Sequence, residues 1–457
     1  MKQTKKLPVE RRPLEESFIA RVEVEDLFGL YTYRLGPTPS ADAESRRLFL
    51  LYGDNGSGKT TVLRLIFNLL SQATNQGHRG YLGRTPFRRL SVTLGEGTSL
   101  TVSRPSGALT GDYHVSVVRK EKRIVDAMIA VDDQGKVRAP QPDLDAFVRV
   151  LVDLNIDLYF LTDDRKGRSS AAVDNEQEHD RMLVRVYQEE LARGRPLRDV
   201  QLPDRSETRL EVTIGRFDAW VRNQALVGST TGELNTNSVY ADIIQRIAKP
   251  RRGRPAGSER DLAELLTTMG RLEDSNRRYA EFGLTSRLNI EPIVAATDGA
   301  SPATTRIIAS VLGPYVDGIQ ARLQALESIQ HLLEVFIESL NSFLNNKSAS
   351  FSLRVGLQIR SRNGELLSSS MLSSGERQLL LLLCDTVLAR DDATIFLIDE
   401  PEISLNVKWQ RTLLDALLRL TVDSPVQFVI ATHSLELLAR HRTSIRQLAD
   451  ENAASVQ

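Results

Sequence analysis

Cysteine is nearly absent from the sequence, which contains a single one, Cys384, in 457 residues. One thiol excludes a disulfide scaffold and agrees with a reducing, cytoplasmic location. Because Cys384 follows a run of five leucines, we expect it to be a buried small residue. No run of about eighteen apolar residues occurs, so no membrane-spanning helix is predicted. The basic N-terminus has no apolar segment behind it, so we expect no signal peptide.

Net charge is also absent, because 59 Lys and Arg residues balance 59 Asp and Glu residues. This balance excludes a global basic field for nucleic acid, and any DNA contact would have to come from local patches. The hydrophobic share of 41% is ordinary for a soluble globular protein. The length is sufficient for about two or three domains.

The segment YGDNGSGKTT, residues 52–61, fits G-x-x-x-x-G-K-[ST] between an apolar run and a helical pattern. Its glycines let consecutive amides point at one phosphate, and the helix N-terminus adds the positive end of its dipole. Lys59 supplies a charge for the β and γ phosphates, and the Thr60 hydroxyl suits Mg²⁺. The alternative is a glycine-rich turn. We predict a nucleotide phosphate site formed by Gly53, Asn55, Gly56, Gly58, Lys59, Thr60 and Thr61.

The remaining pattern predicts three parts, at residues 1–168, 169–347 and 348–457. In the first part we expect strands at 19–24 and 48–52, an antiparallel set over 90–137 and a buried strand at 151–160. The second part is helical, and a helix of roughly 45 Å starts at Tyr315 with an apolar stripe that packs on its own domain or on another chain. Strand texture returns in the third part. The sequence thus predicts an α/β fold whose mixed sheet is split by a helical insertion.

Three polar segments follow in the third part. Ser373, Ser374, Gly375 and Glu376 form a polar loop before an apolar helix, where they either offer amides and hydroxyls to an anion or only cap the helix. Asp399 and Glu400 end an apolar strand, where one carboxylate can support Mg²⁺ and the other can polarise water. His433 ends another apolar strand and can hydrogen-bond a γ-phosphate or the attacking water.

Together GDNGSGKT, LSSGE, IFLIDEPEISL and ATHS resemble the Walker A, signature, Walker B and switch-histidine motifs of ABC-type P-loop ATPases. They are similar to the branch that contains RecF, SMC proteins and the ATPase half of OLD-type enzymes. The DEPEISLN and THS segments are especially similar to ATPases of anti-phage defence systems of the PARIS-like and Septu-like kinds. The resemblance covers residues 15–165 and 348–440, and the helical insertion lies outside it.

The resemblance implies ATP and Mg²⁺ as cofactors and a homodimer, or a higher homo-oligomer, that closes around two nucleotides. Lys59 and Thr60 of one chain would hold phosphates and metal, while the signature residues of the other chain would close over the γ-phosphate. Asp399 would support the metal, Glu400 would activate water, and His433 would sense the γ-phosphate. Hydrolysis could then release the subunits.

Three positions depart from the family pattern. Ser374 replaces one of the two signature glycines, and Asn406 stands where many relatives have histidine. No glutamine can be assigned to the loop that normally contributes to Mg²⁺ binding, and residues 161–166 occupy that region.

The segment PRRGRPAG, residues 250–257, resembles an AT-hook, although a basic proline-rich linker is the simpler interpretation.

The leading hypothesis is an ATP-hydrolysing subunit that regulates or recruits a separate effector, such as a nuclease, in antiviral defence. Because only 24 residues follow His433, we expect the nuclease domain of OLD-type proteins to be absent and the effector to be separate. The alternative is a RecF-like ATPase of DNA repair or maintenance that contacts DNA through Arg251, Arg252 and Arg254. A third hypothesis is a scaffold that binds ATP without hydrolysing it, against which the presence of Glu400 argues.

Overall fold

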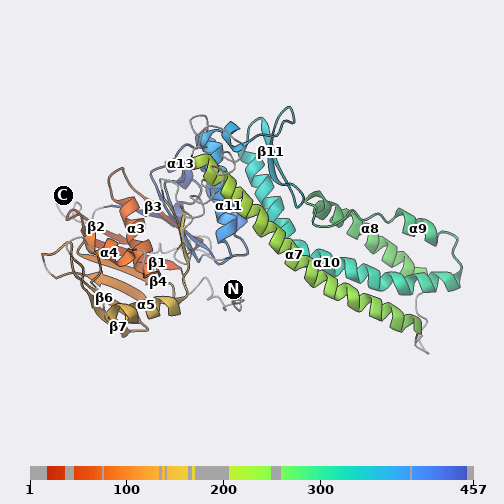
Figure 1. Cartoon of the computed structure of the whole chain (residues 1–457), viewed down its shortest axis with the longest axis horizontal. Coiled ribbons are helices and arrows are strands. Elements are labelled where there is room, and N and C mark those ends of the chain that lie inside the picture. The colour runs from red at the N-terminus through yellow and green to blue at the C-terminus, as the bar shows by residue number, and fades with distance from the viewer. Residues whose placement is uncertain are drawn as a thin grey trace, which may run out of the picture. The chain divides into compact units, whose positions relative to one another are not determined.

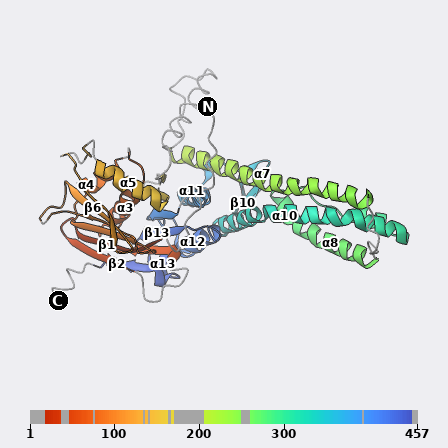
Figure 2. The same cartoon turned by 90° about the horizontal axis from the view of Figure 1, so that it is seen from below.

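The computed structural model describes residues 18–36, 46–74, 77–105, 107–132, 136–138, 142–162, 167–169, 205–248, 259–391 and 394–449 (Figures 1 and 2). The chain divides into two compact units. The split unit combines Met1–Thr208 with Ser374–Gln457, and the inserted unit is Arg209–Ser373. No helix among the described residues is long and apolar enough to cross a membrane.

A six-stranded, mainly parallel sheet in the split unit joins strands from both ends of the chain. Its order is β14 (Ile445–Gln447), β3 (Leu48–Tyr52), β13 (Gln427–Thr432), β12 (Ile395–Asp399), β8 (Leu158–Leu161) and β9 (Gly167–Ser169). Only the β8–β9 pair is antiparallel. All residues of β12 and β13 are buried, as expected for strands covered on both faces. The predicted mixed sheet, split in sequence by an insertion, is therefore confirmed.

The second sheet is antiparallel throughout and comes only from the N-terminal segment. Its order is β2 (Tyr31–Leu35), β1 (Ile19–Leu27), β4 (Arg89–Leu94), β5 (Ser99–Ser103), β6 (Tyr113–Arg119) and β7 (Lys122–Ile129). Alternating burial along β5 and β6 shows one face on the core and one toward solvent. The antiparallel set predicted over residues 90–137 is present.

The strand predicted at residues 151–160 is wrong in its first half. Helix α5 (Pro142–Leu154) runs to Leu154, and β8 starts only at Leu158. The buried residues of α5 are Phe147, Leu151 and Leu154, whose spacing of four and three is helical rather than alternating. The helix period begins before residue 151, and the short apolar run concealed it.

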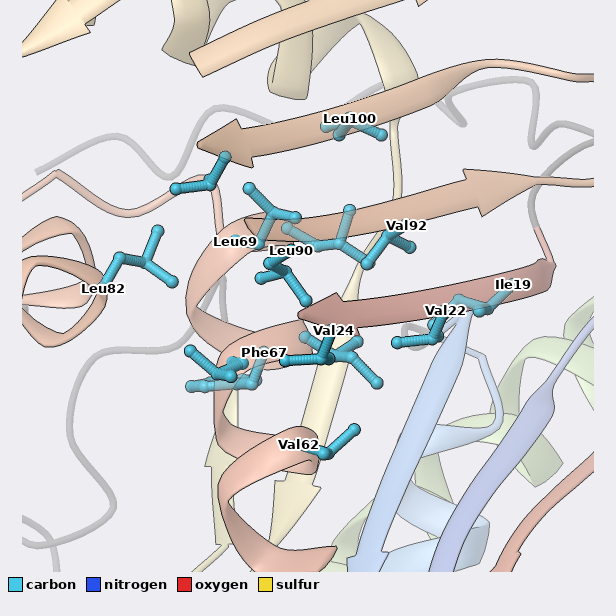
Figure 3. Packing of buried hydrophobic residues seen from close by; sticks show 14 of the residues in the cluster. Ile19, Val22, Val24, Val62, Phe67, Leu69, Leu82, Leu90, Val92 and Leu100 are labelled. Carbon is cyan, nitrogen blue, oxygen red and sulfur yellow. The ribbon is translucent and has the colours of Figure 1, made fainter. Parts of the chain in front are cut away.

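Helix α3 (Lys59–Leu70) is buried on nearly all sides, and its apolar residues belong to a core that includes residues of both sheets. Figure 3 shows Val62, Phe67 and Leu69 of α3 beside Val24 of β1 and Leu90 of β4. Burying each large aliphatic side chain contributes about 1.5–3 kcal/mol. The core therefore fixes the helix whose N-terminus follows the glycine-rich loop.

The C-terminal end of α3 is held by Arg79 of α4 (His78–Arg84). The buried guanidinium donates hydrogen bonds to the carbonyl oxygens of Asn68, Leu69 and Ser71, and it lies over the Phe147 ring. Burial lowers the pKa of Arg79 to about 10, so the group remains charged at neutral pH. A cation at this end complements the negative end of the helix dipole.

The inserted unit contains α7 (Arg205–Ala248), α8 (Glu259–Glu281), α9 (Glu291–Thr297) and α10 (Pro302–Phe343). Helix α10 begins well before the predicted start at Tyr315 and continues through Pro314. Ser301 accepts a hydrogen bond from the Thr304 amide as N-cap, and Pro302 occupies the first turn, where proline is favourable. This start signal lies upstream of the apolar stripe.

The apolar stripe of α10 packs within its own unit. Phe336 stacks on Phe217 of α7 with 4.5 Å between ring centroids. Gly228 of α7 permits close approach, because a Cβ there would lie 2.8 Å from the carbonyl oxygen of Ala325. In Figures 1 and 2, α7 and α10 run side by side. Of the two interpretations of the stripe, the structure shows packing on a neighbouring helix.

Strands β10 (Lys347–Ser352) and β11 (Gly356–Ser361) form a separate two-stranded sheet. They are followed by η1 (Ser369–Met371), and all three belong to the inserted unit, although the sequence assigned them to residues 348–457. The Asp218 carboxylate of α7 accepts a hydrogen bond from the Leu357 amide at 3.1 Å, and Arg222 donates to the Leu353 carbonyl. These bonds fasten the hairpin to the helix, and the inserted unit therefore extends to Ser373.

Candidate functional site

Three loops meet at one edge of the parallel sheet. Strands β3, β13 and β12 are parallel neighbours, and their registers place Tyr52 opposite Thr432 and Asp399 opposite Ala431. Their carboxyl ends therefore lie together, and the segments that follow them carry the glycine-rich loop, Glu400 and His433. In open α/β sheets this edge is where ligands bind.

The glycine-rich loop, residues 53–58, has the backbone that an anion requires. Gly56 and Gly58 have φ angles of +85° and +84°, which favour glycine. A Cβ on Gly58 would also lie 2.9 Å from Leu27 Cδ2. Asn55 and Gly56 are exposed, and the first turn of α3 contains no acidic residue. The positive end of the α3 dipole is therefore not neutralised from within its own first turn.

Lys59 is nearly buried, with 4% of its surface exposed. Its ammonium group donates hydrogen bonds to the carbonyl oxygens of Gly53 at 2.8 Å and Asp54 at 2.9 Å. Among the described residues no carboxylate forms an ion pair with it. Since a buried charge is unfavourable without a counter-charge, this lysine fits an anionic ligand such as phosphate.

Thr60 and Asp399 join the start of α3 to the end of β12. The Thr60 hydroxyl donates to Asp399 Oδ1 at 3.1 Å, and Asp399 is 3% exposed. A hydroxyl and a carboxylate are oxygen ligands of the type that Mg²⁺ prefers. The described residues contain no cluster of three or more acidic, histidine or cysteine side chains that could hold a metal. A magnesium ion here would therefore complete its shell with phosphate and water oxygens.

Glu400 follows Asp399 in a left-handed backbone conformation with φ of +47°. Its amide donates to the Ala431 carbonyl at 2.9 Å, which holds this conformation in place. Such a conformation costs about 1–3 kcal/mol for a residue with a side chain. His433 lies beyond the end of β13, with 45% of its side chain exposed and Nδ1 3.7 Å from Glu400 Oε1.

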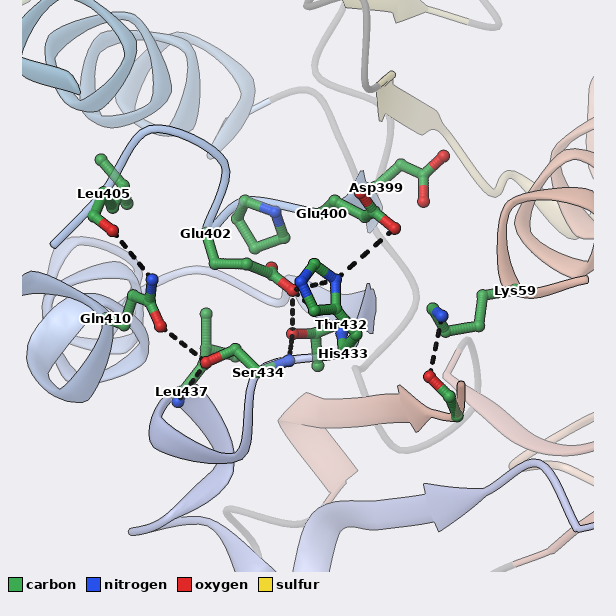
Figure 4. Close-up of polar contacts among 12 residues, drawn as sticks. Lys59, Asp399, Glu400, Glu402, Leu405, Gln410, Thr432, His433, Ser434 and Leu437 are labelled. Atoms are coloured by element: carbon green, nitrogen blue, oxygen red, sulfur yellow. Dashed lines mark hydrogen bonds and ion pairs between the residues drawn. The ribbon is translucent and has the colours of Figure 1, made fainter. Parts of the chain in front are cut away.

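Glu402 is a site residue that the sequence did not single out. It is 4% exposed, and its Oε1 accepts hydrogen bonds from the Thr432 hydroxyl at 2.5 Å and the His433 amide at 2.9 Å. The same oxygen lies 3.3 Å from His433 Nδ1 (Figure 4). The available signal was a second acid two residues after Glu400, in the segment DEPE.

The serine-glycine segment is more helical than predicted. Helix α11 (Ser374–Ala389) includes Ser374, Gly375 and Glu376, so only Ser373 belongs to the preceding loop. The two serines are exposed, whereas Gly375 and Glu376 are buried. A Cβ on Gly375 would lie 2.4 Å from the Ser404 carbonyl oxygen. Gly375 is therefore required for local packing, whatever else this helix start binds.

The other positions noted in the sequence have simpler outcomes. Asn406 is the N-cap of α12 (Val407–Leu420), where its side chain accepts from the Trp409 amide at 3.0 Å. Cys384 is buried, as predicted. Thr61 is half-buried in the first turn of α3. Residues 163–166 lie outside the described part of the chain, as do Arg251, Arg252 and Arg254.

Comparison with known proteins gives one family and several structures. The family model described as "AAA domain, putative AbiEii toxin, Type IV TA system" matches residues 297–439. This region includes Asp399, Glu400, Glu402 and His433 but not the glycine-rich loop. No curated protein matches the chain.

The solved structures similar to this chain include Smc head domains at low identity. One from Pyrococcus furiosus, with an extended coiled coil and bound to the C-terminal domain of ScpA, has 13% identity and a TM-score of 0.37, covering 96% of this chain and 98% of its own. A second, bound to the C-winged helix domain of ScpA, has 12% identity and a TM-score of 0.35, covering 96% of this chain and 99% of its own.

A third, from Pyrococcus yayanosii with a coiled coil and joint, has 14% identity and a TM-score of 0.33, covering 92% of this chain and 93% of its own. The matching family is described as an AAA domain, and the contact between Thr60, after the loop that follows β3, and Asp399, at the end of β12, is consistent with ATP binding.

Proposed function

We propose that this chain binds ATP with Mg²⁺ and hydrolyses it at the carboxyl edge of the parallel sheet. The observation that carries the proposal is the 3.1 Å contact between Thr60 and Asp399, beside a buried Lys59 that lacks a carboxylate partner among the described residues. It brings the hydroxyl and the carboxylate suited to Mg²⁺ next to a cation suited to phosphate.

Each residue then has a distinct task. The amides of residues 53–58 and Lys59 hold the phosphates, and Thr60 with Asp399 holds the metal ion, which neutralises phosphate charge when bound. Glu400, whose side chain is 24% exposed, accepts a proton from the attacking water. His433 donates a hydrogen bond to the γ-phosphate.

A second copy of the chain completes the site. Ser373 and Ser374 are exposed at the start of α11, a helix of 16 residues whose N-terminal amides can bind an anion. We propose that they, with Gly375 and Glu376, close over the γ-phosphate held by the other protomer. Each half-site alone leaves the triphosphate charge incompletely paired, so ATP favours the dimer and hydrolysis releases it.

The biological output proposed is regulation or recruitment of a separate effector, such as a nuclease, in defence against phage. Support comes from the matching family, whose description names a toxin of a type IV TA system. Co-purification of the tagged chain with the products of neighbouring reading frames tests this output. Cleavage of DNA by the purified chain alone would contradict a separate effector.

Phosphate release and light scattering after gel filtration test the ATPase. Lys59→Ala should lose ATP binding and turnover, whereas Glu400→Gln should retain binding, lose turnover and accumulate ATP-bound dimers. Lys122→Ala, at the exposed start of β7, and Glu121→Gln, in the exposed turn before it, are matched controls and should behave as wild type. Unchanged turnover in Glu400→Gln would refute the assignment of the water-activating residue.

A further inference from the structure

We infer that Glu402 is a positioning residue that fixes the ring orientation and tautomer of His433. The effect of Glu402 on ATP turnover rests on the proposed ATPase function, but its effect on the imidazole of His433 does not. Glu402 lies in the segment between β12 and α12, two residues after Glu400.

The hydrogen bonds of Glu402 leave it little freedom. Its Oε1 accepts from the Thr432 hydroxyl and the His433 amide, and the side chain is 4% exposed. Its other oxygen, Oε2, is buried and has no hydrogen-bond partner among the described residues. The carboxylate is therefore fixed beside His433, and it can still accept a hydrogen bond from another donor.

The charge of Glu402 is not needed for the bonds to Thr432 and the His433 amide, because the oxygen of a glutamine would accept both. A buried carboxylate is costly to desolvate and requires compensation. The remaining neighbour is His433 Nδ1, 3.3 Å from Oε1. A carboxylate at this distance favours the proton on Nδ1, and Nε2 on the opposite side of the ring is then free for ligand.

Glu400 competes for the same ring nitrogen. Its Oε1 lies 3.7 Å from His433 Nδ1, farther than that of Glu402 (Figure 4). Without Glu402, the imidazole would pair with Glu400 and occupy the carboxylate that the proposed mechanism assigns to water. Glu402 thus both orients the histidine and leaves Glu400 available.

A chain of hydrogen bonds keeps this arrangement rigid. The Ser434 amide donates to the Thr432 hydroxyl at 2.9 Å, and the Ser434 hydroxyl donates to Gln410 of α12 at 2.7 Å. The Gln410 amide group in turn donates to the Leu405 carbonyl at 2.8 Å. The loops after β12 and β13 are therefore held together through α12, as Figure 4 shows.

Two measurements on the full chain test the inference. In nucleotide-free protein with ¹⁵N-labelled histidine, His433, assigned by its loss in His433→Asn, should carry its proton on Nδ1. Glu402→Gln should shift that population toward the Nε2–H form. With ATP, Glu402→Gln should lower kcat roughly tenfold with little change in KM, as expected for loss of a carboxylate partner of a functional histidine.

The double variant Glu402→Gln/His433→Asn separates positioning from a purely structural role. It should turn over no more slowly than His433→Asn alone, because Glu402 acts through the ring. The matched control is Glu436→Gln. Glu436 lies on the neighbouring α13 (Leu435–Leu438) and forms an ion pair with Arg411 at 2.6 Å, so its replacement should leave kcat and the His433 tautomer unchanged.

An Nε2–H tautomer of His433 in the wild type would overturn the inference without any variant. Additive losses in the double variant, or an unchanged tautomer in Glu402→Gln, would do the same. If the wild type instead binds ATP without turnover, the proposed function fails, and the tautomer measurement still decides the role of Glu402.

Discussion

Replacing Gly375 with alanine tests whether this glycine is required by local packing. The added Cβ would lie 2.4 Å from the Ser404 carbonyl oxygen and 3.3 Å from Trp409 Cζ3. The obstructing atom is backbone, and Ser404 already has a φ of +66°, so the loop has little freedom to move. Helix propensity alone would instead favour alanine by about 1 kcal/mol. The two effects predict opposite signs.

The expected size follows from these two contributions. Overpacking a well-packed site costs about 1–3 kcal/mol, and the helix gain offsets about 1 kcal/mol or less in a first turn. We expect the free energy of unfolding of the split unit to fall by about 1–2 kcal/mol. With a urea slope of about 1–3 kcal/mol/M, the midpoint should fall by roughly 0.3–2 M.

The two tryptophans of the chain permit a local assay. Trp409 lies in the split unit beside position 375, and Trp220 lies in the inserted unit. Urea unfolding followed by Trp409 fluorescence in a Trp220→Phe background therefore reports on the substituted unit. The matched control is Gly215→Ala in α7, followed by Trp220 in a Trp409→Phe background, because a Cβ there meets no atom within 4 Å.

Gly215→Ala should increase stability by about 0.5–1 kcal/mol, as helix propensity predicts. If Gly375→Ala were also as stable as wild type or more stable, the close approach to Ser404 would be refuted. The measurement needs no nucleotide, so its result does not depend on the proposed ATPase function.

Three further outcomes are expected. Arg79→Met should lower the urea stability of the split unit by about 3 kcal/mol, because the last carbonyls of α3 lose their buried donor. Burial raises the pKa of Asp218, so the folded inserted unit binds the Asp218 proton more tightly than the unfolded chain does. The inserted unit should therefore lose stability as the pH rises from the ordinary pKa of an aspartate through the raised pKa of Asp218. Asp218→Asn should flatten this dependence in urea midpoints measured from about pH 4 to 7. Asn406→Ala should cost about 1 kcal/mol through loss of the α12 N-cap, and Asn406→Ser should restore most of it.

Each of these outcomes can fail separately. A wild-type midpoint for Arg79→Met would show that water replaces the guanidinium without loss. A pH profile of Asp218→Asn parallel to that of the wild type would assign the dependence to other groups. A loss in Asn406→Ser as large as that in Asn406→Ala would show that the asparagine does not act as a cap.

Most of the fold follows from patterns that span few residues. Apolar runs bounded by polar residues predicted β3, β12 and β13, and the glycine-rich loop between a strand and a helix predicted the start of α3. The predicted bounds were wrong where a helical pattern runs into a strand pattern, and where the start signal of a helix lies upstream of its apolar stripe. Residues 151–154 complete a helix that begins at Pro142, and α10 begins at the Ser301–Pro302 cap rather than at its stripe.

The sequence by itself determined which side chains end the three central strands, because a motif is a local pattern and parallel strands place their carboxyl ends at one edge. Only the tertiary structure decided that Glu402 accepts a hydrogen bond from the amide of His433, 31 residues further along the chain, and that Gly375 lies against Ser404. Both contacts depend on the register between β12 and β13 and on the packing of α11 and α12. These are long-range quantities that no local spacing specifies.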